Sequence, residues 1–213
     1  GEVYLPQGTY TCAEQIVIDY DYTTIRGSGW ATVINVASQS FNVIYANTQD
    51  YVTLKDFKMI GSAGAGQSGD LINFAAGSTN NVVENLYLTN SDDISIYMLG
   101  GNNTITGNFI SPSDNYAVYS AGNNNIITEN RIIQTADVMA MYSGGYWNRI
   151  SSNYIQAPQN GSQYVIWLNG YFNTVSGNEL NGGGTGIIIE LYHYNTVSDN
   201  NIYTPNYYGI RVY

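Results

Sequence analysis

Aliphatic residues recur along this chain inside a short polar phrase. The phrase is Asn-x-(Ile/Val)-x-x-Asn-x-(Ile/Leu), with aliphatic residues at its third and eighth positions. Its five copies follow one another at nearly even spacing and begin at Asn103, Asn125, Asn148, Asn173 and Asn195. A regular internal period of this kind indicates a solenoid, in which each repeat is one supersecondary unit stacked on the next.

The same aliphatic slots continue upstream in weaker form. They read Val83 and Leu88 in one coil and Leu54 and Met59 in the one before. The corresponding starting positions are 23, 52 and 81, which are more widely spaced than those of the later phrases, so the early coils carry longer loops. We expect a single β-helix domain over 1–213, with longer, irregular coils at 1–80 and regular coils of about 22–25 residues at 81–213.

Short strands, and almost no helices, are predicted between these phrases. Val, Ile, Tyr and Thr dominate short runs that are bounded by Gly and Asn. A second strand precedes each phrase, as in Ile94–Tyr97 and Tyr164–Trp167, so each coil supplies two or three strands. Neighbouring coils pair them in parallel, and the crossover rule makes the winding right-handed. The sequence thus predicts an all-β, right-handed, single-stranded parallel β-helix of about eight or nine coils, with no evident capping helix.

The asparagines of the phrase have a structural interpretation. Those at the sixth position are expected to stack at a tight turn, each amide bonding the next, and are Asn108, Asn130, Asn153, Asn178 and Asn200. Asparagine tolerates left-handed backbone geometry and satisfies the backbone groups of turns. We therefore assign all ten phrase asparagines to building the coil.

Charge and cysteine content narrow the function classes. The net charge is −10 with only six basic residues, which form no patch, so we expect no nucleic-acid partner and no docking on anionic membranes. No apolar run approaches the roughly 20 residues of a spanning helix, so no membrane insertion is expected. Cys12 is alone and forms no intrachain disulfide. A chain rich in Tyr, Asn and Gly suits an extracellular or cell-surface protein. Glycosylation sequons occur at Asn102 and Asn160.

Two stretches at the start of the chain carry a family resemblance. VYLPQGTY at 3–10, followed by TIRGSG at 24–29, resembles the start of pectate-lyase-like β-helix domains. The asparagine phrase resembles the NosD-type repeats of carbohydrate-binding and sugar-hydrolase proteins. The resemblance implies the right-handed β-helix fold. It leaves activity open, because this superfamily includes lyases, hydrolases, epimerases, phage tailspikes and non-enzymatic surface proteins.

The catalytic motifs of these relatives are missing from the sequence. There is no Gly-His-Gly, no Arg-Ile-Lys and no Asp-Pro-His-Glu, and the single histidine, His193, is interpreted as a turn residue. We therefore assign no catalytic residue and favour a protein that is not an enzyme.

A row of aspartates is the candidate metal site. Four of them lie at a constant distance before successive phrase positions, with Asp93 beside the second, and are Asp70, Asp92, Asp114 and Asp137. Residues in one slot of a β-helix stack about 4.8 Å apart. Like charges at that spacing repel unless a cation joins them, and a row of carboxylate oxygens suits Ca²⁺. The alternative is that each aspartate starts an Asx turn. We expect no cofactor, unless these aspartates bind calcium rather than start turns.

A row of aromatic residues is the candidate contact surface. The residue six positions before the start of the phrase is aromatic in four successive coils: Tyr97, Tyr119, Tyr142 and Trp167. The same position holds Ala75 in the coil before them and Ile189 in the coil after them. These rings are expected to face outward, where they bind carbohydrate or another subunit, or only stack on one another. Tyr87, Phe109 and Tyr154 form a shorter row on another face, beside Arg131.

Three functions remain open. The chain starts within a strand at Glu2–Leu5 and ends within another at Gly209–Tyr213, and bare coil ends pair readily with further strands. The first function is an extracellular structural or adhesive solenoid, a homo-oligomer that self-associates end to end into a filament, as a fibre or sheath. The second is a carbohydrate-binding or tailspike-like module with a polysaccharide as its partner. The third is a calcium-dependent polysaccharide lyase or hydrolase that uses Asp92, Asp93 and Asp114.

Overall fold

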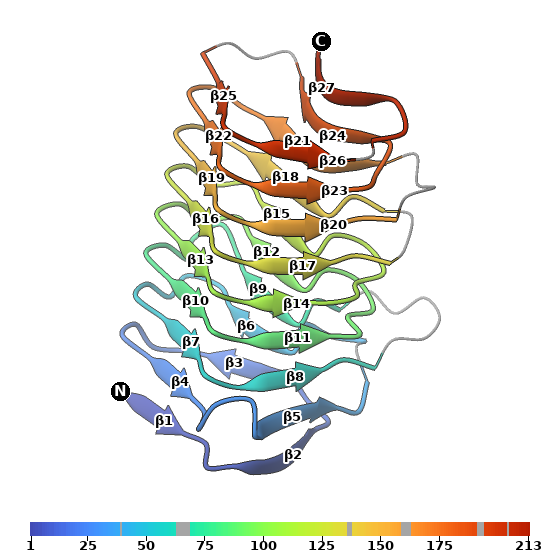
Figure 1. Cartoon of the computed structure of the whole chain (residues 1–213). Coiled ribbons are helices and arrows are strands. Elements are labelled where there is room, and N and C mark those ends of the chain that lie inside the picture. The colour runs from blue at the N-terminus through green and yellow to red at the C-terminus, as the bar shows by residue number, and fades with distance from the viewer. Residues whose placement is uncertain (39, 63–68, 136–137, 159–162, 191–193, 204) are drawn as a thin grey trace.

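The protein is a single stack of β-coils. The computed structural model describes residues 1–38, 40–62, 69–135, 138–158, 163–190, 194–203 and 205–213. Every regular element in these ranges is a strand, and they include no helix that could cross a membrane. The strands, β1 to β27, form three nine-stranded parallel sheets, here named A, B and C. Figure 1 shows the coils rising along one axis, with the two termini at opposite ends.

Each coil contributes one strand to each sheet. Sheet A consists of β1 (Glu2–Tyr4), β4 (Thr24–Arg26), β7 (Thr53–Lys55), β10 (Val82–Glu84), β13 (Thr104–Thr106), β16 (Ile126–Thr128), β19 (Arg149–Ser151), β22 (Thr174–Ser176) and β25 (Thr196–Ser198). Sheet B consists of β2 (Gly8–Cys12), β5 (Thr32–Val36), β8 (Lys58–Ile60), β11 (Tyr87–Thr89), β14 (Phe109–Ile110), β17 (Arg131–Ile133), β20 (Tyr154–Gln156), β23 (Glu179–Asn181) and β26 (Asn201–Tyr203). Sheet C consists of β3 (Ile16–Ile18), β6 (Ile44–Ala46), β9 (Ile72–Phe74), β12 (Ile96–Met98), β15 (Val118–Ser120), β18 (Met141–Gly144), β21 (Tyr164–Asn169), β24 (Thr185–Ile189) and β27 (Tyr208–Val212).

This architecture confirms the predicted right-handed parallel β-helix. The chain passes through sheets A, B and C in turn and enters the next coil with every third strand (Figure 1). In sheet A, Ile25 pairs with Leu54 and Leu54 with Val83 across the longer early coils, and Val83 pairs with Ile105 across a shorter one. The phrase at 103 and beyond is the passage from sheet A into sheet B in each regular coil.

The aliphatic residues of the phrase form the core. Ile105, Ile127 and Ile150 are directly paired at the centres of β13, β16 and β19, and all are buried. Successive side chains of a strand point to opposite faces, so the residues on either side of them face outward. In β16, Ile127 is fully buried while Ile126 is 40% exposed. Removing this column of side chains from water is the main favourable term in forming the stack.

Two asparagine ladders connect the coils, and the one at the sixth phrase position was predicted from the sequence. In the first, the backbone N–H of Asn103 donates to Oδ1 of Asn125, 2.8 Å away, and that of Asn125 donates to Oδ1 of Asn148. In the second, the backbone N–H and the side-chain Nδ2 of Asn108 both donate to Oδ1 of Asn130, at 3.0 and 2.9 Å. These asparagines are buried, so their hydrogen bonds satisfy polar groups that water cannot reach.

The turn from sheet C into sheet A, here called the C–A turn, has a constant backbone. The residue just before the first phrase asparagine is left-handed in every coil, with φ between 55° and 64°. This slot holds Tyr22, Tyr51, Asn80, Asn102, Asn124, Trp147, Phe172 and Tyr194. Asparagine adopts this conformation readily, whereas for a bulky aromatic residue it is an outlier.

Candidate functional site

The predicted aromatic row lies on the outer face of sheet C. Tyr97, Tyr119, Tyr142 and Trp167 are direct partners in the register of β12, β15, β18 and β21, and we call them the aromatic stripe. Their neighbours along each strand, such as Ile96 and Met98, are fully buried, so the rings point outward. All four rings are half-buried rather than freely exposed.

Contact between rings explains this partial burial. Tyr97 stacks on Tyr119 with ring centroids 5.0 Å apart, and Tyr119 stacks on Tyr142 at 4.4 Å. Trp167 meets Tyr142 edge-on, at 5.1 Å and 87°, and Tyr116 packs edge-on against Tyr119. Among the described residues, Trp167 Nε1 is a buried donor without a hydrogen-bond partner. The stripe is therefore a packed aromatic surface that offers ring edges and phenol groups to a ligand.

The register corrects the expected ends of this row. Tyr97 pairs with Asn73, and Trp167 pairs with Ile188, whereas the residue count had placed Ala75 and Ile189 there. The count fails because the segment between sheet C and the phrase changes length at both ends of the row. An amide thus lies beside the first tyrosine of the stripe.

Polar side chains gather at this end of the stripe. Asp70 Oδ2 accepts a 2.7 Å hydrogen bond from Asn73 Nδ2, and Asp70 Oδ1 accepts one from the backbone N–H of Ile94 at 3.3 Å. Asp93 Oδ1 accepts from Asn115 Nδ2 at 2.9 Å. Two carboxylate–amide pairs therefore stand next to an aromatic surface.

Burial raises the pKa values of Asp70 and Tyr97. It raises the pKa of Asp70 to about 6, opposed by the hydrogen bond from Asn73 and helped by the charge of Asp93. The pKa of Tyr97 is also raised, first by burial, then by Tyr119, and further by the charges of Asp70 and Asp93. The phenol of Tyr97 is thus electrostatically coupled to both carboxylates.

The four aspartates do not form one continuous row. Strand register pairs Ile72 with Ile96, so Asp70 lies level with Ile94 rather than Asp92. Asp92 is buried and Asp114 is exposed, and Asp137 lies outside the described residues. Within the described ranges, no three His, Cys, Asp or Glu side chains are placed to hold a metal ion. Calcium binding stays a prediction, which a calcium titration of the melting temperature after chelation would test.

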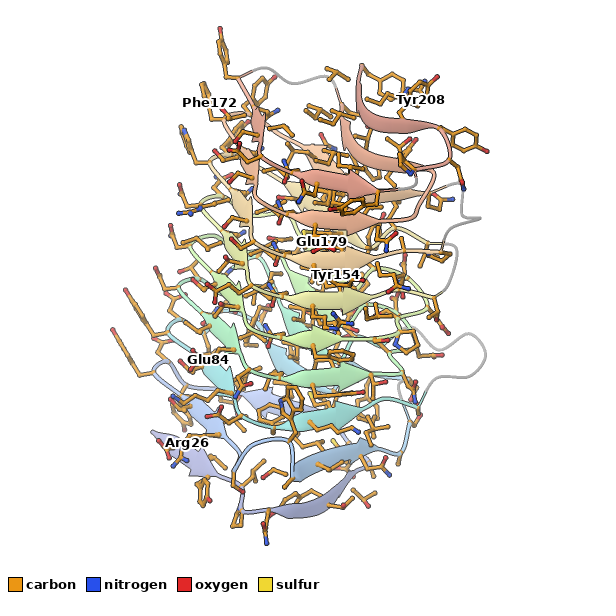
Figure 2. The ribbon with its side chains drawn as sticks, in the orientation of Figure 1. Arg26, Glu84, Tyr154, Phe172, Glu179 and Tyr208 are labelled. Atoms are coloured by element: carbon orange, nitrogen blue, oxygen red, sulfur yellow. The ribbon has the colours of Figure 1, made fainter. Side chains whose placement is uncertain are left out.

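The remaining residues singled out in the sequence lie away from the aromatic stripe or outside the described ranges. His193 and Asn160 lie outside the described residues. The shorter aromatic row is on the outer face of sheet B, where Tyr87 stacks on Phe109 at 4.7 Å. Arg131 lies 4.6 Å above the ring of Tyr154, which Figure 2 labels on that sheet. Cation–π contact accounts for the position of this arginine.

A second aromatic surface was not predicted from the sequence. It lies at the C–A turn of the last coils, and we call it the turn ladder: Tyr146, Trp147, Tyr171, Phe172 and Tyr194. Trp147 stacks on Phe172 at 5.8 Å and 15°, and Phe172 stacks on Tyr194 at 5.1 Å and 6°. Tyr146 and Tyr171, one position earlier, stack at 5.5 Å. Figure 2 shows Phe172 at the outer edge of the ribbon, directed away from the core.

A groove runs beside the turn ladder. It has a volume of about 270 Å³ and is lined by Ala121, Asn123, Gly145, Tyr146, Asn169, Gly170 and Tyr171. Asn169 Nδ2 donates to the hydroxyl of Tyr142 at 3.1 Å, so the groove adjoins the aromatic stripe. The sequence signal for this surface was the slot immediately before each phrase, which holds aromatic residues in the first two and the last three coils and asparagine in the three between.

Comparison with known proteins identifies the class by its fold. No protein-family model matches the chain, and no curated protein sequence matches it. The catalytic domain of a GH87 α-1,3-glucanase in complex with nigerose is similar with a TM-score of 0.56 and 12% identity, over 98% of this chain. The chain spans 61% of the length of that glucanase chain.

Two further solved structures are similar to this chain. The Streptococcus pneumoniae surface protein and adhesin PfbA has a TM-score of 0.52 and 11% identity, over 100% of this chain and 91% of the adhesin chain. The A-module of the Azotobacter vinelandii mannuronan C-5 epimerase AlgE4 has a TM-score of 0.42 and 13% identity, over 100% and 89%. The fold and these neighbours define a parallel β-helix protein.

Proposed function

We propose that this protein is an extracellular, adhesive β-helix module that binds a polysaccharide on the outer face of sheet C. The observation that carries the proposal is the aromatic stripe with two carboxylate–amide pairs at one end. Sugar sites combine aromatic surface with a few well-placed polar groups, because a pyranose ring has apolar C–H faces and a rim of hydroxyls.

The contacts of the polar group fit this task. Asp93 and Asn115 are only partly buried, so their oxygen and nitrogen atoms are accessible to a ligand hydroxyl. Asp70 and Asn73, in the coil before that of Asp93, are buried and hold each other through the 2.7 Å hydrogen bond. The partly exposed pair is suited to contact sugar, and the buried pair to orient the groups around it.

The fold relatives support a carbohydrate-related role at the cell surface. One is a glucanase in complex with the disaccharide nigerose, and another is a surface adhesin. Membership of the NosD-type repeat family, which the asparagine phrase suggested, is part of the same proposal.

Affinity electrophoresis through gels that contain single polysaccharides tests this function. The wild-type protein is expected to be retarded by at least one of them, and Tyr119→Ala is expected to bind about tenfold more weakly, because Tyr119 is the central ring of the stripe. Tyr203→Ala is the control, since Tyr203 is 48% exposed on sheet B, away from the stripe. Equal retardation of wild type and Tyr119→Ala would remove the stripe from the function.

Two other functions stay predictions. End-to-end association into a fibre is tested by negative-stain microscopy of concentrated protein, where strictly monodisperse particles would contradict it. Calcium-dependent lyase or hydrolase activity by Asp92, Asp93 and Asp114 is tested by unsaturated-product absorbance and new reducing ends on uronate polymers.

A further inference from the structure

We propose that the turn ladder and its groove form a second binding site, which takes an uncharged sugar chain. This site lies at the C–A turn of the last coils, around the corner from the aromatic stripe. It goes beyond the function proposed above, because it does not require the stripe to bind sugar.

The exposure of the turn ladder is the first argument. Trp147 is 59% exposed, Phe172 46% and Tyr194 75%, and Tyr146 beside them is exposed as well. Single exposed aromatic residues are ordinary, but a contiguous exposed cluster usually marks an interaction site. The rings stack on one another, and at least two fifths of the surface of Tyr146, Trp147, Phe172 and Tyr194 remains in water.

The backbone beneath the rings is the second argument. Trp147, Phe172 and Tyr194 have φ values of 56°, 58° and 64°, in the left-handed region. Asn102 and Asn124 make the same turn in earlier coils with φ values of 58° and 57°, in a conformation that asparagine favours. A non-glycine residue held in this region costs on the order of 1–3 kcal/mol. The turn itself does not need aromatic residues, so the backbone does not account for their presence.

The open face of Trp147 supplies a platform. Phe172 covers one face of the indole, and on the other side the corresponding position of the preceding coil is Asn124. None of the described aromatic rings stacks in parallel on that second face. The apolar face of a pyranose ring can therefore lie on it, directly over the coil that carries Asn123 and Asn124.

The groove supplies hydrogen-bonding groups beside this platform. Asn123 Oδ1 accepts from the backbone N–H of Tyr146 at 2.8 Å, which fixes the amide and leaves Nδ2 with no partner among the described residues. Asn169 Nδ2 donates to Tyr142, which leaves Oδ1 as an acceptor. A donor and an acceptor on coils that flank the coil of Tyr146 match the hydroxyl groups of a sugar.

The charge of the lining residues decides the class of sugar. All seven residues that line the groove are neutral, and the whole chain has a net charge of −10. An acidic polymer would meet no cation there and would be repelled by the protein. A second copy of this chain carries the same negative charge, which disfavours it as the occupant. An uncharged glycan meets neither obstacle.

The test uses the full chain in affinity electrophoresis with three neutral polysaccharides, namely a soluble β-glucan, an α-glucan and a galactomannan. Polygalacturonate is the charged comparison. We expect wild type to be retarded by at least one neutral polymer and not by polygalacturonate. Trp147→Asn is expected to bind about tenfold more weakly or not at all, because the platform is lost. Its melting temperature is expected to stay the same or rise, since the turn then contains asparagine, as it does at Asn102 and Asn124 in earlier coils.

Tyr51→Asn is the matched control. Tyr51 occupies the same turn slot with φ 57° and stacks on Tyr22, but lies four coils away from Trp147. It is expected to leave retardation unchanged. Phe172→Asn provides a second ladder variant should Trp147→Asn fold poorly, and is expected to weaken binding in the same direction.

Several results would overturn the proposal. They are no retardation by any neutral polymer, equal retardation of wild type and both ladder variants, and retardation by polygalacturonate alone. Sedimentation that shows a wild-type dimer lost in Trp147→Asn would assign the surface to a second copy instead. Loss of binding in Tyr119→Ala but not in the ladder variants leaves the stripe as the site and rejects the ladder, and the reverse result rejects the stripe.

Discussion

Single asparagine side chains join neighbouring coils of this protein. Oδ1 of Asn130 accepts two hydrogen bonds from Asn108, while its own Nδ2 donates to the carbonyl of Ile105 at 2.9 Å. All these groups are buried, so water cannot replace any bond that is lost. At the scale of the residue, the fold thus depends on side-chain amides that act as backbone groups.

Asn130→Ala should therefore destabilise the protein. It leaves the buried backbone N–H of Asn108 without its acceptor, which costs about 1–3 kcal/mol. Urea denaturation is expected to show this loss in the midpoint. Asn201→Ala is the control, because Asn201 is exposed and its side chain belongs to neither ladder. An unchanged midpoint for Asn130→Ala would contradict a stabilising role for the ladder.

The buried carboxyl of Asp70 should make stability depend on pH. Its pKa is raised from 3.8 to about 6, so the folded protein favours the neutral form. The stabilising contribution is fully present below pH 3.8 and is lost as the pH rises through about 6. A shift of this size corresponds to about 3 kcal/mol between the two ends of that range.

Melting curves between pH 4 and pH 7 measure this effect. Asp70→Asn is neutral at every pH and is expected to flatten the dependence, whereas the same change at the exposed Asp114 is expected to preserve it. A wild-type slope retained in Asp70→Asn would show that another group is responsible.

At the scale of the strand, the alternation of inward and outward side chains decides which residues contribute to the core. In β16, Ile126 and Ile127 are adjacent and have the same side chain, but Ile126 is 40% exposed and Ile127 is fully buried. Ile127 pairs with Ile105 and Ile150 in the adjacent coils, so its side chain fills the centre of the column.

This pair of isoleucines provides a matched comparison. Ile127→Ala is expected to lower the free energy of unfolding by about 2–5 kcal/mol, because it leaves a cavity in the core. Ile126→Ala on the same strand is expected to change it by less than about 0.5 kcal/mol. Denaturant titration of both variants measures the difference, and similar losses would mean that the outward face of sheet A is also packed.

Sequence periodicity predicts most of these elements and less of the surface. The phrase locates the strands of sheets A and B because its aliphatic residues are always at the third and eighth positions. The third-position residues Ile105, Ile127 and Ile150 therefore fall in register. Sheet C is less certain, since the turns around it vary in length, and Ala75 was expected where Asn73 lies. The turn ladder was not predicted because its slot holds asparagine in three consecutive coils, which interrupts the row of aromatic residues.

At the scale of the whole molecule, three aromatic surfaces are distributed around the circumference of the stack. The outer face of sheet C carries the aromatic stripe, sheet B carries a row in which Arg131 covers Tyr154, and the C–A turn carries the turn ladder. These surfaces share one core and one set of asparagine ladders. Substitutions on one surface are therefore expected to be additive in stability with substitutions on another.

The constant left-handed backbone of the C–A turn has a consequence for how such a protein changes over generations. Because the slot accepts Asn124, Trp147 or Phe172 with φ values of 57°, 56° and 58°, one side chain can replace another without shifting any strand. Each coil is then an independent site of variation, and a recognition surface can be lengthened, shortened or moved along the axis one residue at a time. Specificity in this architecture can diversify while the scaffold beneath it stays unaltered.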